Sequence, residues 1–412
     1  METKNQRNCK TICLFFPDKE MYQACMAESG KKMFRAYIDE VYQANPELFP
    51  AAMTQGYQLC GVINSTKLDL PMRRIRLKSD QETYQIRPSF AMPYMIGWTD
   101  EVEKPLYLLQ WGVPFEALAY VFGRDPMYWY RAYIAFGRPS IVGSTVKAGE
   151  KLPADVLADE KHSRHRGEKI YITTTVGQEC ILGADLAKNA GAAALEQGYQ
   201  TFKTEAREVA PQYHPQTVNT DGWQATQKAW LALFPTVTII LCFLHAWLKI
   251  QQRCKRNHRL YQEVKQKVWH LYHAQTVPQF AQRVRRLREW ANRHLTGVVH
   301  EKVLELCHNA PHFKKAFAHP SAHRTSNMLD RLMNYQDRLL YAMQYLHGHQ
   351  DSARLYIRAM ALFWNFHPYG QKTQAKYEAT CLSPFERLNG FRYHDNWLHN
   401  FLIAASLGGR PG

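Results

Sequence analysis

The sequence lacks the cysteine patterns that hold structural zinc or that staple small secreted domains together. Its nine cysteines are scattered along 412 residues, with no C-x-x-C pair and no dense framework. Such spacing predicts reduced thiols, as in a cytosolic compartment. The apolar run near the N-terminus is only about five residues long, too short for the hydrophobic region of a signal peptide. We therefore expect a cytoplasmic protein.

Long apolar runs are also missing. The stretch TVTIILCFLHAWLKI, residues 236–250, begins like a buried strand but is interrupted by His245 and Lys249. It therefore cannot supply the roughly 20 apolar residues that a membrane-spanning helix needs. We expect no membrane partner.

Acidic residues are in deficit. The chain has 52 Lys and Arg against 36 Asp and Glu, which gives a formal net charge of +16. This surplus favours a polyanionic partner, and with membranes set aside the first choice is nucleic acid. Hydrophobic residues make up 46% of the chain, as is typical of a folded protein. The length allows about two to four domains.

The N-terminal region, residues 1–98, has weak periodicity and a basic cluster, MRRIRLK, at 72–78. We expect it to be part of a mainly helical N-terminal region that binds DNA. In residues 99–148 apolar positions recur at helical spacing and are broken by two Gly- and Pro-containing turns, which predicts a helix-turn-helix.

Three residues of the last helix in that segment are candidates for DNA contact. Trp129, Tyr130 and Arg131 follow one another there and offer two aromatic rings and a cation to phosphates or bases. The alternative is that the aromatic residues pack a small helical core.

A block rich in strands follows. The expected elements are strands at 155–162, 169–177 and 180–187, a helix at 191–210, a strand at 217–223, a helix at 224–234 and a strand at 237–241. This order predicts a mixed five-stranded sheet in which three antiparallel strands precede parallel ones, with helices on both faces. The fold class is therefore α/β.

The segment from Ala246 to Val298 predicts an all-α insertion with one strongly basic face. It has 12 Lys and Arg against 2 Glu, a net charge of +10 over 53 residues. A charge run can be no more than a solvated helix surface, but this one favours phosphate binding. Together with the helix-turn-helix residue, the candidate DNA-binding residues are Arg131, Lys249, Arg253, Lys255, Arg256, Arg285 and Arg286.

Two carboxylates stand at the ends of expected strands. Asp159 lies near the end of the first strand and Asp221 follows the fourth. Asp155 or Glu160 could take the place of Asp159, and Asp221 could simply cap the next helix. Two carboxylates about 4 Å apart repel by roughly 4 kcal/mol at an effective dielectric near 20, so such a pair points to a cation. An all-oxygen site suits Mg²⁺ or Mn²⁺.

These features together resemble the ribonuclease H-like core of DDE transposases. The order of strands and helices, the acid on the first strand and the Asp-Gly after the fourth are similar to that core. Cys242 and His245 resemble the C/D(2)H signature found after the second acid in several transposase groups, Mutator-like ones included. The segments FGRDPMYWYR, CFLHAWLKI, TSNMLDRLM and FRYHDNWLHNFLIAASLGG resemble a group of bacterial insertion-sequence transposases, and the likeness runs from about residue 85 to the C-terminus.

The resemblance also indicates the third acid. RTSNMLDRLM is similar to a T-[ST]-N-x-x-E segment, with Asp330 standing where Glu is more usual. The rival is Glu386, but its segment resembles one that follows the catalytic helix and whose Glu binds no metal. Asp330 could also be a surface acid paired with Arg331 or Arg338.

Cys242 and His245 admit two interpretations. A zinc site would need two further ligands, and Cys254 and His258 on the next helix are the available pair. We favour the other interpretation, in which Cys242 packs as a small hydrophobe. His245 then lies near the acids and hydrogen-bonds a carboxylate or the scissile phosphate.

The resemblance implies a DDE/DDD transposase that cuts and joins double-stranded DNA at transposon ends. Asp159, Asp221 and Asp330 would bind Mg²⁺ or Mn²⁺, and His245 would assist them. The implied parts are a catalytic core at 149–250 and 324–370, an insertion at 251–323 and a docked tail at 371–412. The enzyme would be bacterial, nucleoid-associated and at least dimeric on DNA. Alternatives are a non-cleaving DNA-binding descendant and a related nuclease without strand transfer.

Overall fold

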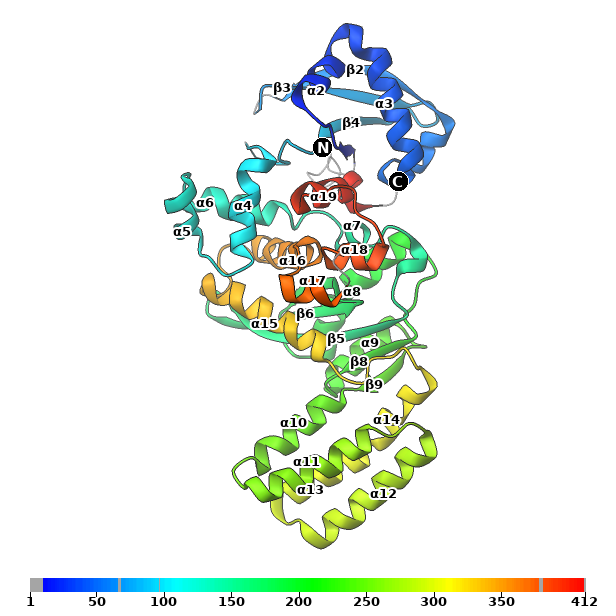
Figure 1. The fold of residues 1–412 in the computed structure, drawn as a ribbon, viewed down its shortest axis with the longest axis vertical. Helices are drawn as coiled ribbons and strands as arrows, with labels where there is room; N and C mark the ends of the chain where they lie inside the picture. Colours follow the sequence, from blue (N-terminus) through cyan, green and yellow to red (C-terminus); the bar gives the residue numbers. More distant parts are fainter. Residues whose placement is uncertain (1–9, 66–67, 96, 378–380, 411–412) are drawn as a thin grey trace.

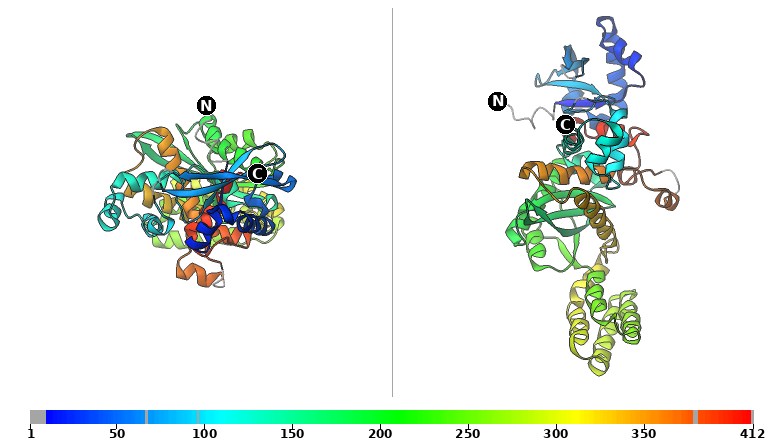
Figure 2. Two further views of the ribbon diagram at one scale, coloured as in Figure 1. Left: turned by 90° about the horizontal axis from the view of Figure 1, so that it is seen from above. Right: turned by 90° about the vertical axis from the view of Figure 1, so that its left-hand side faces the viewer.

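The computed structural model describes residues 10–65, 68–95, 97–377 and 381–410. The molecule is elongated, with an N-terminal α/β unit at one end, a mixed sheet in the middle and a helical bundle at the other end (Figure 1). The side view in Figure 2 shows the same succession along the long axis. No helix in the described ranges is long and apolar enough to cross a membrane.

The N-terminal unit contains a four-stranded sheet. Its elements are β1 (Thr11–Leu14), α2 (Lys19–Met26), α3 (Lys31–Ala44), β2 (Tyr57–Ser65), β3 (Leu70–Leu77) and β4 (Thr83–Pro88). The strand order is β1-β4-β3-β2, with β1 parallel to β4 and the other pairs antiparallel. The expectation of a mainly helical N-terminal region missed this sheet.

The reason lies in β3, which carries the basic cluster. Ile75 and Leu77 are fully buried and alternate with Arg74 and Arg76, so the strand has the period of two that a half-buried strand needs. Arg73 shares the inner face and is only 1% exposed. Its guanidinium donates to the carbonyl oxygens of Cys25 at 2.7 Å and Met26 at 3.2 Å, at the end of α2. Because a buried arginine that binds the end of a helix stands in this strand, its sequence does not show the apolar pattern of a core strand.

Four helices connect this unit to the central sheet: α4 (Thr99–Leu109), α5 (Phe115–Phe122), α6 (Pro126–Ala135) and α7 (Ile141–Thr145). A short turn joins α5 to α6, as expected for a helix-turn-helix. Trp129 is buried and donates through Nε1 to the carbonyl of Gly123 at 3.1 Å, and the ring of Tyr130 packs against Phe115. The aromatic residues therefore pack the helices, and Arg131 alone of the three candidates is exposed.

The central sheet has five strands, and the prediction of a mixed five-stranded sheet is confirmed. The strands are β5 (Asp155–His165), β6 (Glu168–Gly177), β7 (Cys180–Ala187), β8 (Thr217–Thr220) and β9 (Thr238–Leu241). Their order is β7-β6-β5-β8-β9. The pairs β5–β6 and β6–β7 are antiparallel, whereas β5–β8 and β8–β9 are parallel.

Helices cover both faces of this sheet (Figure 1). One face carries α8 (Ala192–Val209) and α9 (Gln224–Leu233), and the other carries α15 (Asn327–Ala342). Side chains alternate between the faces of β5. Glu160 accepts a hydrogen bond from Tyr199 of α8 at 2.8 Å, whereas the neighbouring Lys161 pairs with Asp337 of α15 at 2.5 Å. Asp159 lies on the same face of β5 as Lys161, toward α15.

The helical bundle is inserted between β9 and α15. Its helices are α10 (Phe243–Cys254), α11 (His258–Tyr272), α12 (Val277–His294), α13 (Gly297–His308) and α14 (Ala310–Lys314). Val264, Val268 and Leu271 form a buried stripe along α11 at helical spacing, so this face fills the bundle core and leaves the charges outside. The prediction of an all-α insertion is confirmed.

The C-terminal part returns to the N-terminal unit. Its helices are α16 (Gln350–Phe366), α17 (Gln371–Lys376), α18 (Pro384–Asn389) and α19 (Trp397–Ala404). Leu398 and Phe401 of α19 are fully buried. Just beyond α19 the hydroxyl of Ser406 accepts from the backbone N–H of Cys13 in β1 at 2.9 Å. The tail is therefore docked, as its aromatic pattern suggests.

Candidate active site

Asp159 and Asp221 lie side by side where the pairing of β5 with β8 stops. The expectation that Asp159 lies near the end of its strand is wrong, because β5 continues to His165 through its pairing with β6. In the parallel pair β5–β8 the last partners are Leu157 and Asn219. Asp159 and Asp221 each come two residues later, so they continue the two strands side by side. On the far side of β8, Thr220 pairs with Leu241 at the end of β9. Carboxyl ends of parallel strands share one edge of a sheet, and this edge is where open α/β sheets place their sites.

Asp221 sits in a tight turn between β8 and α9. Gly222 has φ +96°, a conformation that glycine adopts without strain, and it reverses the chain directly after the acid. One oxygen of Asp221 accepts the backbone N–H of Trp223 at 2.8 Å. The turn therefore fixes the carboxylate beside the end of β8. The capping role considered for Asp221 is not found, because α9 has Trp223 at its N-cap and no side-chain cap.

The electrostatics join all three predicted acids. Burial, together with the negative charges of Asp221 and Asp330, raises the pKa of Asp159 to about 6, although the backbone N–H of Glu160 and the charge of His245 oppose the rise. Burial also raises the pKa of Asp330, again opposed by His245. Asp221, Asp330 and His245 therefore all lie within electrostatic range of Asp159. The four residues predicted for catalysis thus lie in one region of the molecule, around Asp159.

His245 stands in the first turn of α10, directly after β9. Its hydrogen bond with Cys242 and the nearby carboxylates of Asp159 and Asp221 outweigh its burial and raise its pKa to about 9. The imidazole is therefore a cation at neutral pH and partly neutralises the acids. Burial alone would raise the pKa of the Cys242 thiol, but hydrogen bonds from His245 and Ser326 lower it below its ordinary value. Cys242 thus makes a specific polar contact rather than acting only as a small hydrophobe.

The alternatives to Asp159 have other partners. Asp155 is buried and accepts a hydrogen bond from the hydroxyl of Thr217 at 2.7 Å. Glu160 points to the opposite face of the sheet, where Thr226 donates to it at 2.8 Å. Both carboxylates are thus held in hydrogen bonds that support the sheet, and Asp159 is the acid of this strand that faces α15.

The rival third acid lies elsewhere. Glu386 belongs to α18, which packs against α16 and β7, and β7 is the edge strand opposite β9. Its carboxylate pairs with Arg392 at 2.6 Å and accepts the backbone N–H of Leu382 at 2.9 Å. Asp330, in the first turn of α15, is the acid that shares an edge with Asp159.

A cavity of about 210 Å³ opens beside Asp221, between the sheet edge and the bundle. Gln227, Lys249, Asn309 and His312 are among its lining residues. Of the four candidate catalytic residues, Asp221 is the one that lines this cavity, together with cationic and amide side chains. Nevertheless, within the described residues no three His, Cys, Asp or Glu side chains are already close enough together to hold a metal ion. Metal binding would require the acids to move toward one another.

The candidate DNA-binding residues are all exposed, but they fall into two places. Six of them lie on the insertion: Lys249, Arg253, Lys255, Arg256, Arg285 and Arg286. Arg131 lies on α6, on the other side of the central sheet from the bundle (Figure 1). Nε of Arg285 lies 3.7 Å from the carboxylate of Glu289, one helical turn away on the same exposed surface.

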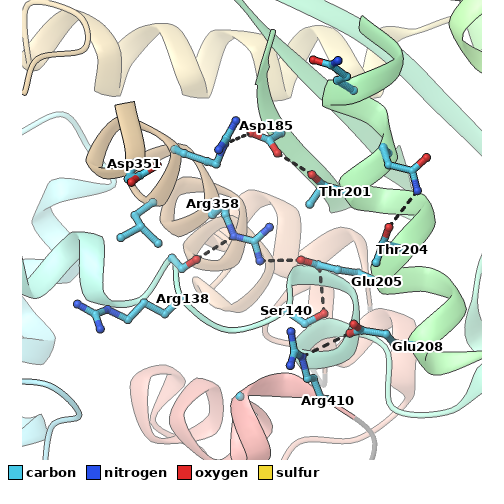
Figure 3. Close-up of a pocket in the computed structure, with 16 residues that line it drawn as sticks. Arg138, Ser140, Asp185, Thr201, Thr204, Glu205, Glu208, Asp351, Arg358 and Arg410 are labelled. Carbon is cyan, nitrogen blue, oxygen red and sulfur yellow. Dashed lines mark hydrogen bonds and ion pairs between the residues drawn. The ribbon is translucent and has the colours of Figure 1, made fainter. Parts of the chain in front are cut away.

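A larger cavity, of about 710 Å³, lies between α8 and α16 and away from the acids (Figure 3). Charged groups around it pair with one another. Arg358 contacts Glu205 at 2.7 Å, and Arg354 contacts Asp185 at 2.6 Å. Glu205 also accepts the backbone N–H of Ile141 at 2.6 Å at the start of α7. These contacts hold three helices to the sheet, so we regard this cavity as structural despite its size.

Ser326 is the site residue that the sequence did not single out. Its hydroxyl lies 3.3 Å from Nδ1 of His245 and 3.2 Å from Sγ of Cys242. It stands immediately before α15, inside the TSNMLD segment that indicated the third acid. Among the described residues, Cys242 and His245 belong to no group of three His, Cys, Asp or Glu side chains that could hold zinc.

Comparison with known proteins does not assign this chain to a family. No family model matches the chain, and no curated protein matches it.

Proposed function

We propose that the protein is a DDE/DDD-type DNA transposase, which cuts DNA at the ends of a mobile element and joins those ends to target DNA. The observation that carries the proposal is the placement of Asp159 beside Asp221 where the pairing of β5 with β8 stops, with Asp330 and His245 within electrostatic range of Asp159. Acids rarely gather in this way unless they serve chemistry or a cation, because each raises the pKa of its neighbours.

The arrangement of the sheet supports the same proposal. Three antiparallel strands followed by two parallel ones, in the order β7-β6-β5-β8-β9, are what a ribonuclease H-like core requires. The helical bundle enters between the second acid and the third, a placement that several transposase groups share. Both features agree with the resemblance that the sequence motifs suggested.

The residues fit Mg²⁺ or Mn²⁺. Three carboxylates supply only oxygen ligands, which hard divalent cations prefer, and a cation would relieve the repulsion that raises the pKa of Asp159. Bound ions would supply an activated water or 3′-hydroxyl and would stabilise the leaving oxygen of a phosphodiester. Asp159 and Asp221 would hold the ions from the sheet, and Asp330 would close the site from α15.

The remaining groups would handle the DNA. His245 is cationic at neutral pH and stands beside the acids, so it can hydrogen-bond a non-bridging oxygen of the scissile phosphate. The exposed Lys and Arg side chains of the insertion would hold the flanking duplex through its phosphates. The two ends of an element must meet before they are joined, so the active assembly would contain at least two copies.

The test is to incubate the purified protein with Mg²⁺ and DNA that carries the repeats flanking its gene. We expect nicked ends and products in which those ends are joined to a target plasmid, and neither product when Mg²⁺ is chelated. Cutting without joining would favour the nuclease, and binding without cutting would favour the non-cleaving DNA-binding protein. Either result would overturn the proposal.

A further inference from the structure

The insertion leaves the sheet and returns to it at one point. The chain departs after β9 at Cys242 and comes back at Ser326, 84 positions later, immediately before α15. Two hydrogen bonds flank this crossing. The backbone N–H of Phe243 donates to the carbonyl of Arg324 at 3.0 Å, and the side-chain amide of Asn219 donates to the carbonyl of His323 at 2.7 Å. Strand β8 and the start of α10 therefore both bind the returning segment.

A cluster of three side chains, the 242–326 clasp, closes the crossing. It consists of Cys242, His245 and Ser326. The backbone N–H of Ser326 donates to Sγ of Cys242 at 3.2 Å, and the hydroxyl of Ser326 lies 3.2 Å from the same sulfur. That hydroxyl is also 3.3 Å from Nδ1 of His245. Cys242 is 2% exposed and Ser326 is 3% exposed, so water does not compete for these bonds.

The clasp sets where α15 begins. The carbonyl of Ser326 accepts the backbone N–H of Asp330 at 2.9 Å, the first hydrogen bond of that helix. Asp330 therefore stands one helical turn from the clasp. Because a helical turn is rigid over this distance, a displacement of Ser326 displaces the carboxylate of Asp330 as well.

We propose that Cys242 and Ser326 are positioning residues, whose clasp fixes the start of α15 and so sets the position from which Asp330 approaches Asp159 and Asp221 when a metal ion binds. This inference rests on the proposed function, since it assigns the clasp a purpose at the same site. It also gives the C-x-x-H spacing a physical role. The Cys just after β9 contacts the returning chain, and the His one turn later contacts Ser326 and lies within electrostatic range of Asp159 and Asp221.

The test compares Cys242→Ala and Ser326→Ala with Cys254→Ala. Cys254 is a matched control, because it is a buried cysteine at the end of α10 and lies outside the clasp. We measure the Mn²⁺ concentration that half-saturates each protein, by electron paramagnetic resonance without DNA, and DNA affinity without metal. We expect about a tenfold rise in half-saturating Mn²⁺ for both clasp variants, and no change for Cys254→Ala. DNA affinity should be unchanged in all three. A smaller rise is expected for Cys242→Ser, whose hydroxyl still accepts the Ser326 N–H.

A second measurement does not depend on metal or on activity. Amide hydrogen exchange in residues 326–334 should become at least tenfold faster in Cys242→Ala and stay unchanged in Cys254→Ala. Equal exchange in the two variants, or equal Mn²⁺ half-saturation, would overturn the role of the clasp. If the wild-type protein instead binds Mn²⁺ through an intact clasp but cuts no DNA, the proposed function fails while the clasp stands.

Discussion

At the scale of single residues, the surroundings of Asp159 disfavour the charged form of its carboxyl group. Its pKa rises from 3.8 to about 6, chiefly through burial and then through Asp221. Between these pH values the folded protein binds the proton more tightly than the unfolded chain does, so stability falls as pH rises toward 6 and stays lower above it. Side chains placed for chemistry commonly carry such a cost.

We therefore predict that Asp159→Asn stabilises the protein at pH 7.5. The gain should be about 2 kcal/mol, because the substitution removes the unfavourable charge, and it should vanish near pH 4. Chemical unfolding at both pH values measures it. Asp337→Asn is the control, since that acid is exposed on α15 and pairs with Lys161. Destabilisation by Asp159→Asn at pH 7.5 would contradict the electrostatic description of the site.

Asp221→Asn should separate binding from cutting. An amide keeps the size of the side chain and can still accept the Trp223 N–H, so the turn survives, but it removes a charged metal ligand. We expect cutting to fall by at least a thousandfold while affinity for end DNA stays within twofold. Gel assays of both properties on one preparation provide the measurement. A variant that still nicks DNA at the wild-type rate would show that Asp221 is not catalytic.

At the scale of elements, the insertion should dominate the affinity for DNA. Arg285→Glu combined with Arg286→Glu reverses two exposed charges on α12. We predict a loss of affinity of at least tenfold, and a slope of log affinity against log salt that is shallower by about 2, since each lost phosphate contact contributes about 0.9.

The matched control reverses two exposed charges elsewhere, Lys188→Glu and Arg207→Glu, near the end of β7 and on α8. It changes the net charge by the same amount but should leave the salt slope close to that of the wild type. Equal losses in the two double variants would mean that overall charge, rather than the insertion, governs DNA binding.

Elements with clear periodicity could be predicted from the sequence. The β-branched run at 169–177 and the apolar segment at 180–187 correspond closely to β6 and β7, and the helical insertion follows from the stripe along α11. The sheet of the N-terminal unit was missed because Arg73, a buried cation, interrupts the apolar alternation of β3. Its reason for being buried, the carbonyl groups at the end of α2, is a tertiary contact that local sequence does not reveal.

The site was partly predictable in the same sense. Asp159 and Asp221 could be placed at one edge because carboxyl ends of parallel strands meet there. The third acid needed a family resemblance, since Asp330 lies beyond a bundle of five helices and nothing local ties it to the sheet. Ser326 could not be foreseen at all, because its contact with Cys242 joins positions 84 residues apart.

At the scale of the whole molecule, the central sheet lies between two outer parts of different character (Figure 1). The insertion extends from the edge that bears the acids, and the N-terminal unit docks on the C-terminal helices at the other side. Much of the net charge of +16 lies on the insertion, because 53 residues there carry a net charge of +10. Duplex DNA bound along the insertion would therefore run toward the acids.

This arrangement predicts that joining depends on assembly. Under the proposed function one set of acids would serve one DNA end at a time, so two copies should bind together when two ends are present. Light scattering of the protein with paired-end DNA should give a mass of at least two chains, and single-end DNA should give fewer joined products. Joining of both ends by a complex with one copy would contradict the account.

The most direct test of the central claim is a Mn²⁺ titration of the wild-type protein and three variants, followed by electron paramagnetic resonance. We predict that Asp221→Asn and Asp330→Asn each weaken Mn²⁺ binding at least tenfold. Glu386→Gln should leave it unchanged, because that carboxylate is engaged by Arg392. Wild-type binding unaffected by Asp221→Asn and Asp330→Asn would contradict the claim that these acids share a metal ion.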